Sequence, residues 1–165
     1  MNTEKNDYPL LLKQIDSLID VKTGFLPNLG NILSIIKESL PLLWVGTYIV
    51  KNDNLILGPF QGPPACTLIP KGKGVCGQSW EKEKPFLVPD VHKFEGHIAC
   101  SPDSKSEIVI PLWDQNKKIF MVLDIDSDKL NGLSTEDLVF FQEVSLKIEK
   151  IYRKSPEVLK TAYFG

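Results

Sequence analysis

The stretch EIVIPLWDQNKKIFMVLDID, residues 107–126, decides the fold. Its two halves, 107–113 and 119–126, are rich in β-branched and apolar residues, and a polar segment at 114–117 separates them. Runs of this kind on either side of a short polar turn predict a β-hairpin. The remaining elements of the chain are therefore expected to be arranged around an antiparallel pair of strands.

A second hairpin is predicted upstream. LLWVGTYIV (42–50) and LILGPF (55–60) flank the polar turn at 51–54, again with aromatic and β-branched residues on both sides. Short strands are expected at 67–69, between the turn-rich segments QGPPAC and PKGKG, and at 85–88. The chain thus favours a mainly antiparallel sheet.

Helices are expected before, between and after these strands. Two amphipathic runs open the chain, and Pro41 ends the second; their apolar residues are Leu11, Ile15, Leu18 and Ile19, then Leu29, Ile32, Leu33, Ile36 and Leu40. The segment 74–84 predicts a short helix. Ser134 begins a capping box for a long final helix, with Leu138, Phe141, Val144, Ile148 and Ile151 on one face. These elements describe an α+β domain whose central sheet is flanked by helices.

Length and charge limit the function classes. At 165 residues and 18.6 kDa the chain predicts a single domain, 1–165, with a core of about 8–153 and a loosely attached C-terminal tail. Nineteen basic and 21 acidic residues give a net charge of −2, which argues against nucleic acid as a partner. The charged N-terminus and the short apolar runs argue against a signal peptide and a membrane span, so we expect a cytoplasmic protein.

Carboxylates share one face of the 107–126 hairpin. Side chains alternate along a strand, so Asp124 and Asp126 face away from the side that holds Met121, Leu123 and Ile125. Glu107 reaches the same face from the other strand of the hairpin. A solvated strand face is the more common interpretation of such a pattern. If the face is buried instead, the acids can hold an ammonium group or donate a proton.

The reactive side chains are few, and three of them cluster. The chain has two histidines, His92 and His97, and both lie close to Cys100 in a segment, 89–106, that has no helical or strand period. Loops of this length are usually functional or disordered. Cys66 and Cys76 complete an odd set of cysteines, which are expected to be thiols in a reducing compartment and to serve either packing or chemistry.

We expect neither a metal site nor a phosphate loop. His92, His97 and Cys100 are eligible metal ligands, but the sequence has no CxxC and no HExxH. PKGKGVCG (70–77) lacks the GxxxxGK[ST] spacing of a phosphate-binding loop. Cys76, near a helix start, could gain thiolate character from the helix dipole, although a buried cysteine that fills space is the more common case.

Several strings together resemble one known family, the GAF-domain free methionine-(R)-sulfoxide reductases. In chain order they are GPFQGPPAC (58–66), GKGVCG (72–77), DVHKFEGHIAC (90–100), SKSEIVIP (104–111) and VLDIDS (122–127). The resemblance implies a GAF fold and reduction of the R-sulfoxide of free methionine, not of methionine within proteins. It also implies a thioredoxin-type reductant and no cofactor, and family members often form homodimers.

The resemblance also implies roles for the cysteines. By motif position, Cys100 is the nucleophile and Cys66 the most favoured resolving thiol. Cys76 is a second resolving thiol or a relay, and Cys76 as nucleophile is the main rival assignment. In such a cycle the attacking cysteine becomes a sulfenic acid, a second cysteine condenses with it to form a disulfide, and an external dithiol reopens that bond.

Five further residues match the family's substrate site. Glu107, Asp124 and Asp126 match acids that bind the substrate and assist protonation of its oxygen, while Trp44 and Tyr48 match an aromatic wall around the sulfoxide methyl group. Trp44 could equally be simple core packing. The sequence departs from the family pattern at Thr47, Lys105 and Met121, and Met121 is expected to face the core.

Two other functions fit the same residues. A GAF domain can bind a small molecule without chemistry, since the fold serves many functions. The cysteines could also form a redox switch that alters a partner without turnover. The acids and the aromatic wall favour a substrate, and therefore the reductase.

Overall fold

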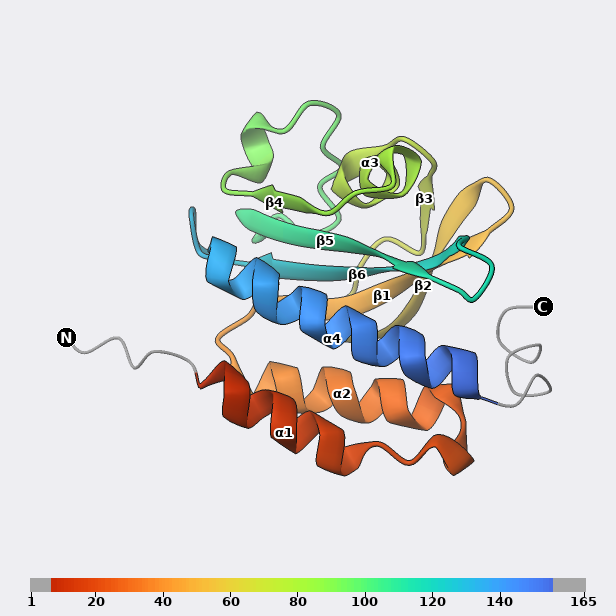
Figure 1. The fold of residues 1–165 in the computed structure, drawn as a ribbon. Coiled ribbons are helices and arrows are strands. Elements are labelled where there is room, and N and C mark those ends of the chain that lie inside the picture. Colours follow the sequence, from red (N-terminus) through yellow and green to blue (C-terminus); the bar gives the residue numbers. More distant parts are fainter. Residues whose placement is uncertain (1–6, 156–165) are drawn as a thin grey trace.

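A six-stranded antiparallel sheet organises the chain, of which the computed structural model describes residues 7–155 (Figure 1). In chain order its strands are β1 (Trp44–Lys51), β2 (Asn54–Gln61), β3 (Leu68–Pro70), β4 (Phe86–Val88), β5 (Ser106–Trp113) and β6 (Ile119–Ser127). Their order across the sheet is β3-β2-β1-β6-β5-β4, and every neighbouring pair is antiparallel. Both predicted hairpins, β1–β2 and β5–β6, are confirmed, and they join where β1 pairs with β6.

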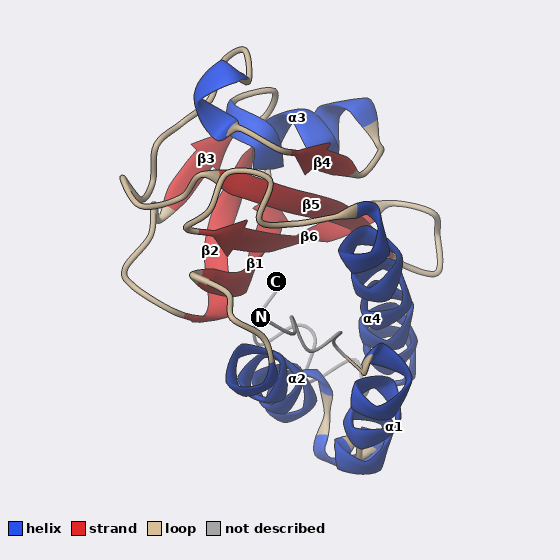
Figure 2. Cartoon of the chain, turned by 90° about the vertical axis from the view of Figure 1, so that its left-hand side faces the viewer, coloured by secondary structure: helices blue, strands red, loops and turns tan. Residues whose placement is uncertain are grey.

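Three helices lie on one side of the sheet: α1 (Tyr8–Leu18) packs against α2 (Phe25–Ser39), and α2 and α4 (Thr135–Lys154) cover the sheet face (Figures 1 and 2). A 3₁₀ turn, η1 (Val21–Thr23), connects the first two. The main apolar core lies between these helices and the sheet, and Met121, Leu123 and Ile125 enter it as the alternation predicted. The capping box at Ser134 is also confirmed, because Ser134 and Asp137 each bind the other's backbone N–H.

The opposite face of the sheet carries a smaller layer, α3 (Gly74–Lys82) and the connection that follows β4 (Figure 2). That connection was predicted to be irregular throughout, but Val91–Lys93 form a 3₁₀ turn, η2, which the Asp90 carboxylate caps at the His92 N–H. A second apolar cluster lies under this layer and includes Trp44, Tyr48, Cys76, Val109 and Val122. Three of the predicted site residues, Trp44, Tyr48 and Cys76, belong to this second cluster.

The α+β prediction with a central antiparallel sheet flanked by helices is confirmed. Helix α4 continues to Lys154, one residue beyond the expected core, with Ser155 as its C-cap, and residues 156–165 of the predicted C-terminal tail lie outside the described residues. Within residues 7–155, no helix has the length and apolar character needed to cross a membrane.

Candidate active site

Strand register brings the predicted acids together. β5 and β6 pair Glu107 with Asp126 and Val109 with Asp124, so all three carboxylates lie on the face opposite the main core. Glu107 and Asp124 are each only 6% exposed, and Asp126 is partly buried. The interpretation of this face as solvated is therefore wrong. The face is buried because α3, which is distant in sequence, packs across β5 and β6 and removes it from water.

Aromatic residues of β1 extend the same face. Trp44 pairs with Asp126 and Gly46 with Asp124, so Trp44, Gly46 and Tyr48 follow one another beside the acids. The Trp44 ring stacks on Tyr48 at 6.0 Å and on Phe60 at 5.3 Å between ring centroids. Gly46 allows this packing, since a Cβ there would lie 2.4 Å from Cη2 of Trp44. Sequence reasoning missed Gly46, although a glycine between two aromatic residues in WVGTY is a signal for close approach.

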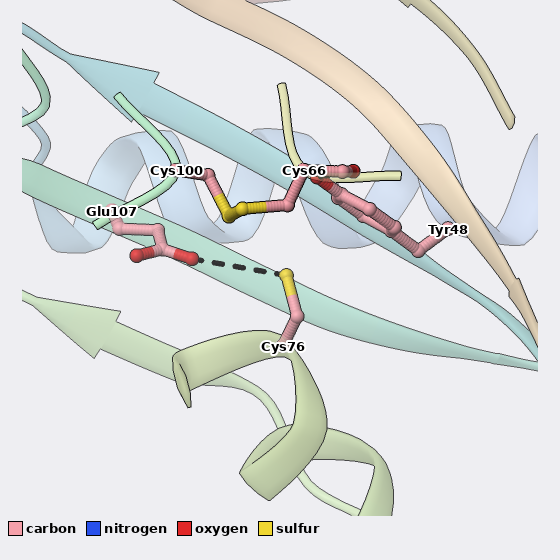
Figure 3. Close-up of a disulfide and its surroundings, with 5 residues drawn as sticks. All are labelled: Tyr48, Cys66, Cys76, Cys100 and Glu107. Carbon is pink, nitrogen blue, oxygen red and sulfur yellow. Dashed lines mark hydrogen bonds between the residues drawn. A yellow bond between two sulfur atoms is a disulfide. The ribbon is translucent and has the colours of Figure 1, made fainter. Parts of the chain in front are cut away.

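Two of the three cysteines form a disulfide at the same place. Cys66 and Cys100, 34 positions apart, are joined with an S–S distance of 2.07 Å and a Cα–Cα distance of 5.1 Å (Figure 3). The aromatic residues of β1 hold the Cys66 segment: Nε1 of Trp44 donates to the Pro63 carbonyl at 3.1 Å, and the Tyr48 hydroxyl donates to the Cys66 carbonyl at 3.0 Å. Trp44 is therefore more than core packing.

The third cysteine lies across the cavity from the disulfide. Cys76, in the first turn of α3, is a buried free thiol, and its Sγ lies 3.8 Å from Oε1 of Glu107 (Figure 3). Burial, followed by the nearby charges of Asp124 and Glu107, raises the pKa of the Cys76 thiol well above its ordinary value. The helix start does not turn Cys76 into a thiolate, because burial and the acids outweigh the dipole.

The pKa values of the three carboxyl groups are raised. Burial, then Asp124 and Asp126, raises the pKa of Glu107, and burial, then Asp126, raises that of Asp124. The pKa of Asp126 rises to about 6, again by burial, although a hydrogen bond from the Ser104 hydroxyl opposes the rise. Protons thus remain on this cluster at a pH where exposed carboxyls have lost theirs. The cluster can supply a proton to a ligand or, when ionised, bind a cation.

One cavity joins these groups. It is lined by Trp44, Tyr48, Cys76, His97, Cys100, Ser104, Glu107, Asp124 and Asp126, with apolar neighbours that include Pro64, Ile69 and Ile98. The space open to a water-sized molecule within it is about 40 Å³. Cys66 is not among the lining residues but reaches the cavity through its bond to Cys100.

The two histidines have different surroundings. His97 lines the cavity, and its Nδ1 is buried without a hydrogen-bond partner in the described structure. Burial, then the charge of His92, lowers the pKa of His97. His92 is exposed and meets His97 edge to face at 6.3 Å between ring centroids. Of the pair, only His97 is placed to affect a bound molecule.

The chain matches known proteins over most of its length. Residues 29–149 match the model of the GAF domain family. The free methionine-R-sulfoxide reductase of Escherichia coli is 40% identical over 145 residues, covering 87% of each chain. Its counterpart from Saccharomyces cerevisiae is 38% identical, covering 85% of this chain and 82% of the yeast protein.

A solved structure shows the same similarity in three dimensions. The free methionine-R-sulfoxide reductase of Neisseria meningitidis, determined in complex with its substrate, superposes with a TM-score of 0.85 at 41% identity. The match covers 92% of this chain and 91% of the other. Identity, coverage and fold agree along nearly the whole sequence, and the chain therefore belongs to the GAF-domain family of free methionine-(R)-sulfoxide reductases.

Proposed function

We propose that this protein reduces free L-methionine-(R)-sulfoxide to L-methionine with electrons from thiols. One observation carries the proposal: the Cys66–Cys100 disulfide borders the cavity that holds Glu107, Asp124 and Asp126. A thiol pair that can be oxidised and acids that retain protons are the two requirements of sulfoxide reduction. Here both meet in one buried place.

The first step transfers oxygen. The Cys100 thiolate attacks the sulfoxide sulfur while a protonated carboxyl group, Glu107 in our assignment, donates a proton to the oxygen. The attack forms a bond between Sγ of Cys100 and the substrate sulfur. The protonated oxygen then transfers to Sγ as this bond and the sulfur–oxygen bond of the substrate break, so that methionine departs as the reduced product and Cys100 is left as a sulfenic acid. The raised pKa of Glu107 supports its role as the donor, and the raised pKa of Cys76 argues against Cys76 as the thiolate.

The second step forms the disulfide and water. Cys66 attacks the Cys100 sulfenic acid, the hydroxyl group leaves as water, and the resulting bond is the one that the structure contains. A thioredoxin-type dithiol then reduces this bond by thiol–disulfide exchange, becomes a disulfide itself and restores both thiols. The cycle converts one sulfoxide and one dithiol into methionine, water and one disulfide.

Substrate binding is assigned to the rest of the cavity. An ionised carboxylate of Asp124 or Asp126 is suited to the ammonium group of a free amino acid, while Trp44 and Tyr48 offer an apolar wall for the sulfoxide methyl group. The disulfide state leaves about 40 Å³, enough for very few water molecules. Free methionine sulfoxide is larger than this space, so the Cys100 loop must open to admit it. We therefore expect reduction of the disulfide to precede substrate binding.

The test is turnover with pure protein. Free L-methionine-(R)-sulfoxide and dithiothreitol are expected to yield methionine, whereas the S epimer and a methionine sulfoxide blocked at both its amino and carboxyl groups are not. Disulfide formation without methionine would replace the reductase by a redox switch. Absence of both would leave a binding module.

Three wider expectations follow from the same assignment. A thioredoxin system should replace dithiothreitol in the assay, because the disulfide must exchange with a protein dithiol. We further propose a cytoplasmic location and a homodimeric state. Fractionation of cells and sedimentation of the purified protein test these two properties directly.

A further inference from the structure

We propose that Cys76, Glu107 and Asp124 form a binding site for a thiophilic divalent cation such as Zn²⁺, and that the bound ion excludes the substrate. The donor atoms come from three packed elements, α3, β5 and β6, and lie within 4.8 Å of one another. All three residues are buried. Metal binding does not depend on the proposed reductase activity, whereas inhibition by the metal does.

The spacing of the donors suits a small ion. Zinc binds thiolate sulfur at about 2.3 Å and carboxylate oxygen at about 2.0 Å, so two such donors in a tetrahedral site lie roughly 3.5 Å apart. Sγ of Cys76 and Oε1 of Glu107 are 3.8 Å apart. A small movement of either side chain therefore completes a two-point site without movement of the backbone.

An unpartnered atom marks the third ligand. Asp124 is only 6% exposed, and its Oδ1 is buried with no hydrogen-bond partner in the described part of the chain. A buried carboxylate oxygen without a partner is costly, and a cation bound beside it removes this cost. The orphaned atom belongs to the same cluster as Cys76 and Glu107.

The charge of the cavity favours a dication over a monocation. Glu107, Asp124 and Asp126 line it, and within residues 7–155 no Lys or Arg does. The ammonium group of an amino acid offsets one negative charge, and a divalent ion offsets two.

Donor type sets the choice of ion and the consequence of binding. A thiolate beside two carboxylates favours Zn²⁺ or Cd²⁺ over Mg²⁺ and Ca²⁺. The Cys76 thiol loses its proton to solvent when the metal binds. Since the ion occupies the acids assigned to the substrate's ammonium group and to proton donation, it acts as an inhibitor and not as a cofactor.

The disulfide form of the protein provides a clean test, because Cys76 is then its only thiol. Titration with Cd²⁺ at neutral pH is expected to produce a thiolate-to-cadmium charge-transfer band that saturates at one equivalent. Zn²⁺ should abolish the band, and excess Mg²⁺ should not. Cys76→Ser should remove the band, and Asp124→Asn should weaken Cd²⁺ binding by about tenfold or more. The exposed acid Glu95, altered to Gln, serves as the matched control and should change nothing.

Overlap with the substrate is tested in a Cys66→Ser, Cys100→Ser double variant, which keeps Cys76 and lacks the disulfide. Free methionine sulfoxide should displace Cd²⁺ from this variant, as followed by loss of the band. No band in the wild-type protein, or a band of equal affinity in Asp124→Asn and Glu107→Gln, would overturn the metal site. A band that methionine sulfoxide leaves unchanged would overturn the exclusion. Circular dichroism of each variant confirms that it is folded, and none of these readouts requires turnover.

Discussion

The hydroxyl group of Tyr48 donates a hydrogen bond to the backbone carbonyl of Cys66. Tyr48 lies at the centre of β1, an interior strand of the sheet, and is only 1% exposed, so the bond ties one half of the disulfide to the buried part of the sheet. Tyr48, which was predicted as part of an aromatic wall, thus holds the backbone of Cys66, the cysteine that we propose as the resolving thiol.

Tyr48→Phe should slow the formation of the disulfide more than the release of methionine. The substitution keeps the ring and removes the bond, whose net contribution is about 1 kcal/mol, or roughly fivefold in a rate. Rapid-quench measurement of methionine, compared with thiol loss in the same reaction, separates the two steps. Equal slowing of both would assign Tyr48 to the substrate and not to Cys66.

Gly46→Ala should destabilise the protein and reduce its activity. The added Cβ would lie 2.3 Å from Cβ of Phe60 and 2.4 Å from Cη2 of Trp44, so the stacked aromatic residues must move. Overpacking of this kind costs about 1–3 kcal/mol, measurable by urea unfolding. Gly30→Ala is the matched control, because no heavy atom lies within 4 Å of its Cβ position and the helix interior favours Ala. Equal stability of the two variants would contradict the proposed role of Gly46.

A single turnover without reductant should distinguish the roles of the three cysteines. Cys100→Ser should form no methionine, because the attacking sulfur is lost. Cys66→Ser should form one equivalent and then stop with an unresolved sulfenic acid on Cys100, which a dimedone adduct identifies by mass spectrometry. Cys76→Ser should retain both the first turnover and the Cys66–Cys100 bond. A full equivalent from Cys100→Ser and none from Cys76→Ser would make Cys76 the nucleophile.

Stability should fall as the pH rises through the range in which the buried acids ionise. The pKa of Asp126 is raised from 3.8 to about 6 in the folded protein, so the folded state binds more protons than the unfolded state between these values. The free energy of unfolding therefore decreases from about pH 4 to about pH 6, and the raised pKa values of Glu107 and Asp124 extend the decrease to higher pH.

Asp126→Asn tests this assignment by urea unfolding at several pH values. The variant should show a shallower decrease than the wild type, whereas the exposed loop variant Asp103→Asn should follow the wild type. If the free energy of unfolding of Asp126→Asn changed with pH in parallel with that of the wild type, the Asp126 carboxyl group would not be the cause of the pH dependence.

Local pattern was enough to predict the direction of side chains in β6 and the start of α4. Alternation along 119–126 correctly separated Met121 from Asp124, because side-chain direction in a strand depends on the backbone alone. The capping box at Ser134 was likewise legible, since all its atoms lie within one turn.

Burial could not be predicted from the same pattern. Whether Asp124 faces water depends on α3, which lies some fifty positions earlier in the sequence and packs across β5 and β6. The contact between Cys76 and Glu107 has the same origin, and no spacing rule indicates it. The Cys66–Cys100 pairing was expected only from the family resemblance, because the reach of two loops depends on the whole sheet.

The alternation of β6 has a consequence for how the protein can fail. A shift of one position in the register of β6 would place the carboxylates of Asp124 and Asp126 in the main apolar core. The same shift would place Leu123 and Ile125 on the cavity side of the sheet. Such a molecule would lose its main interior together with its chemistry. We therefore expect molecules with the shifted register to be proteolysed or to aggregate. A population that is folded but inactive through this error is not expected.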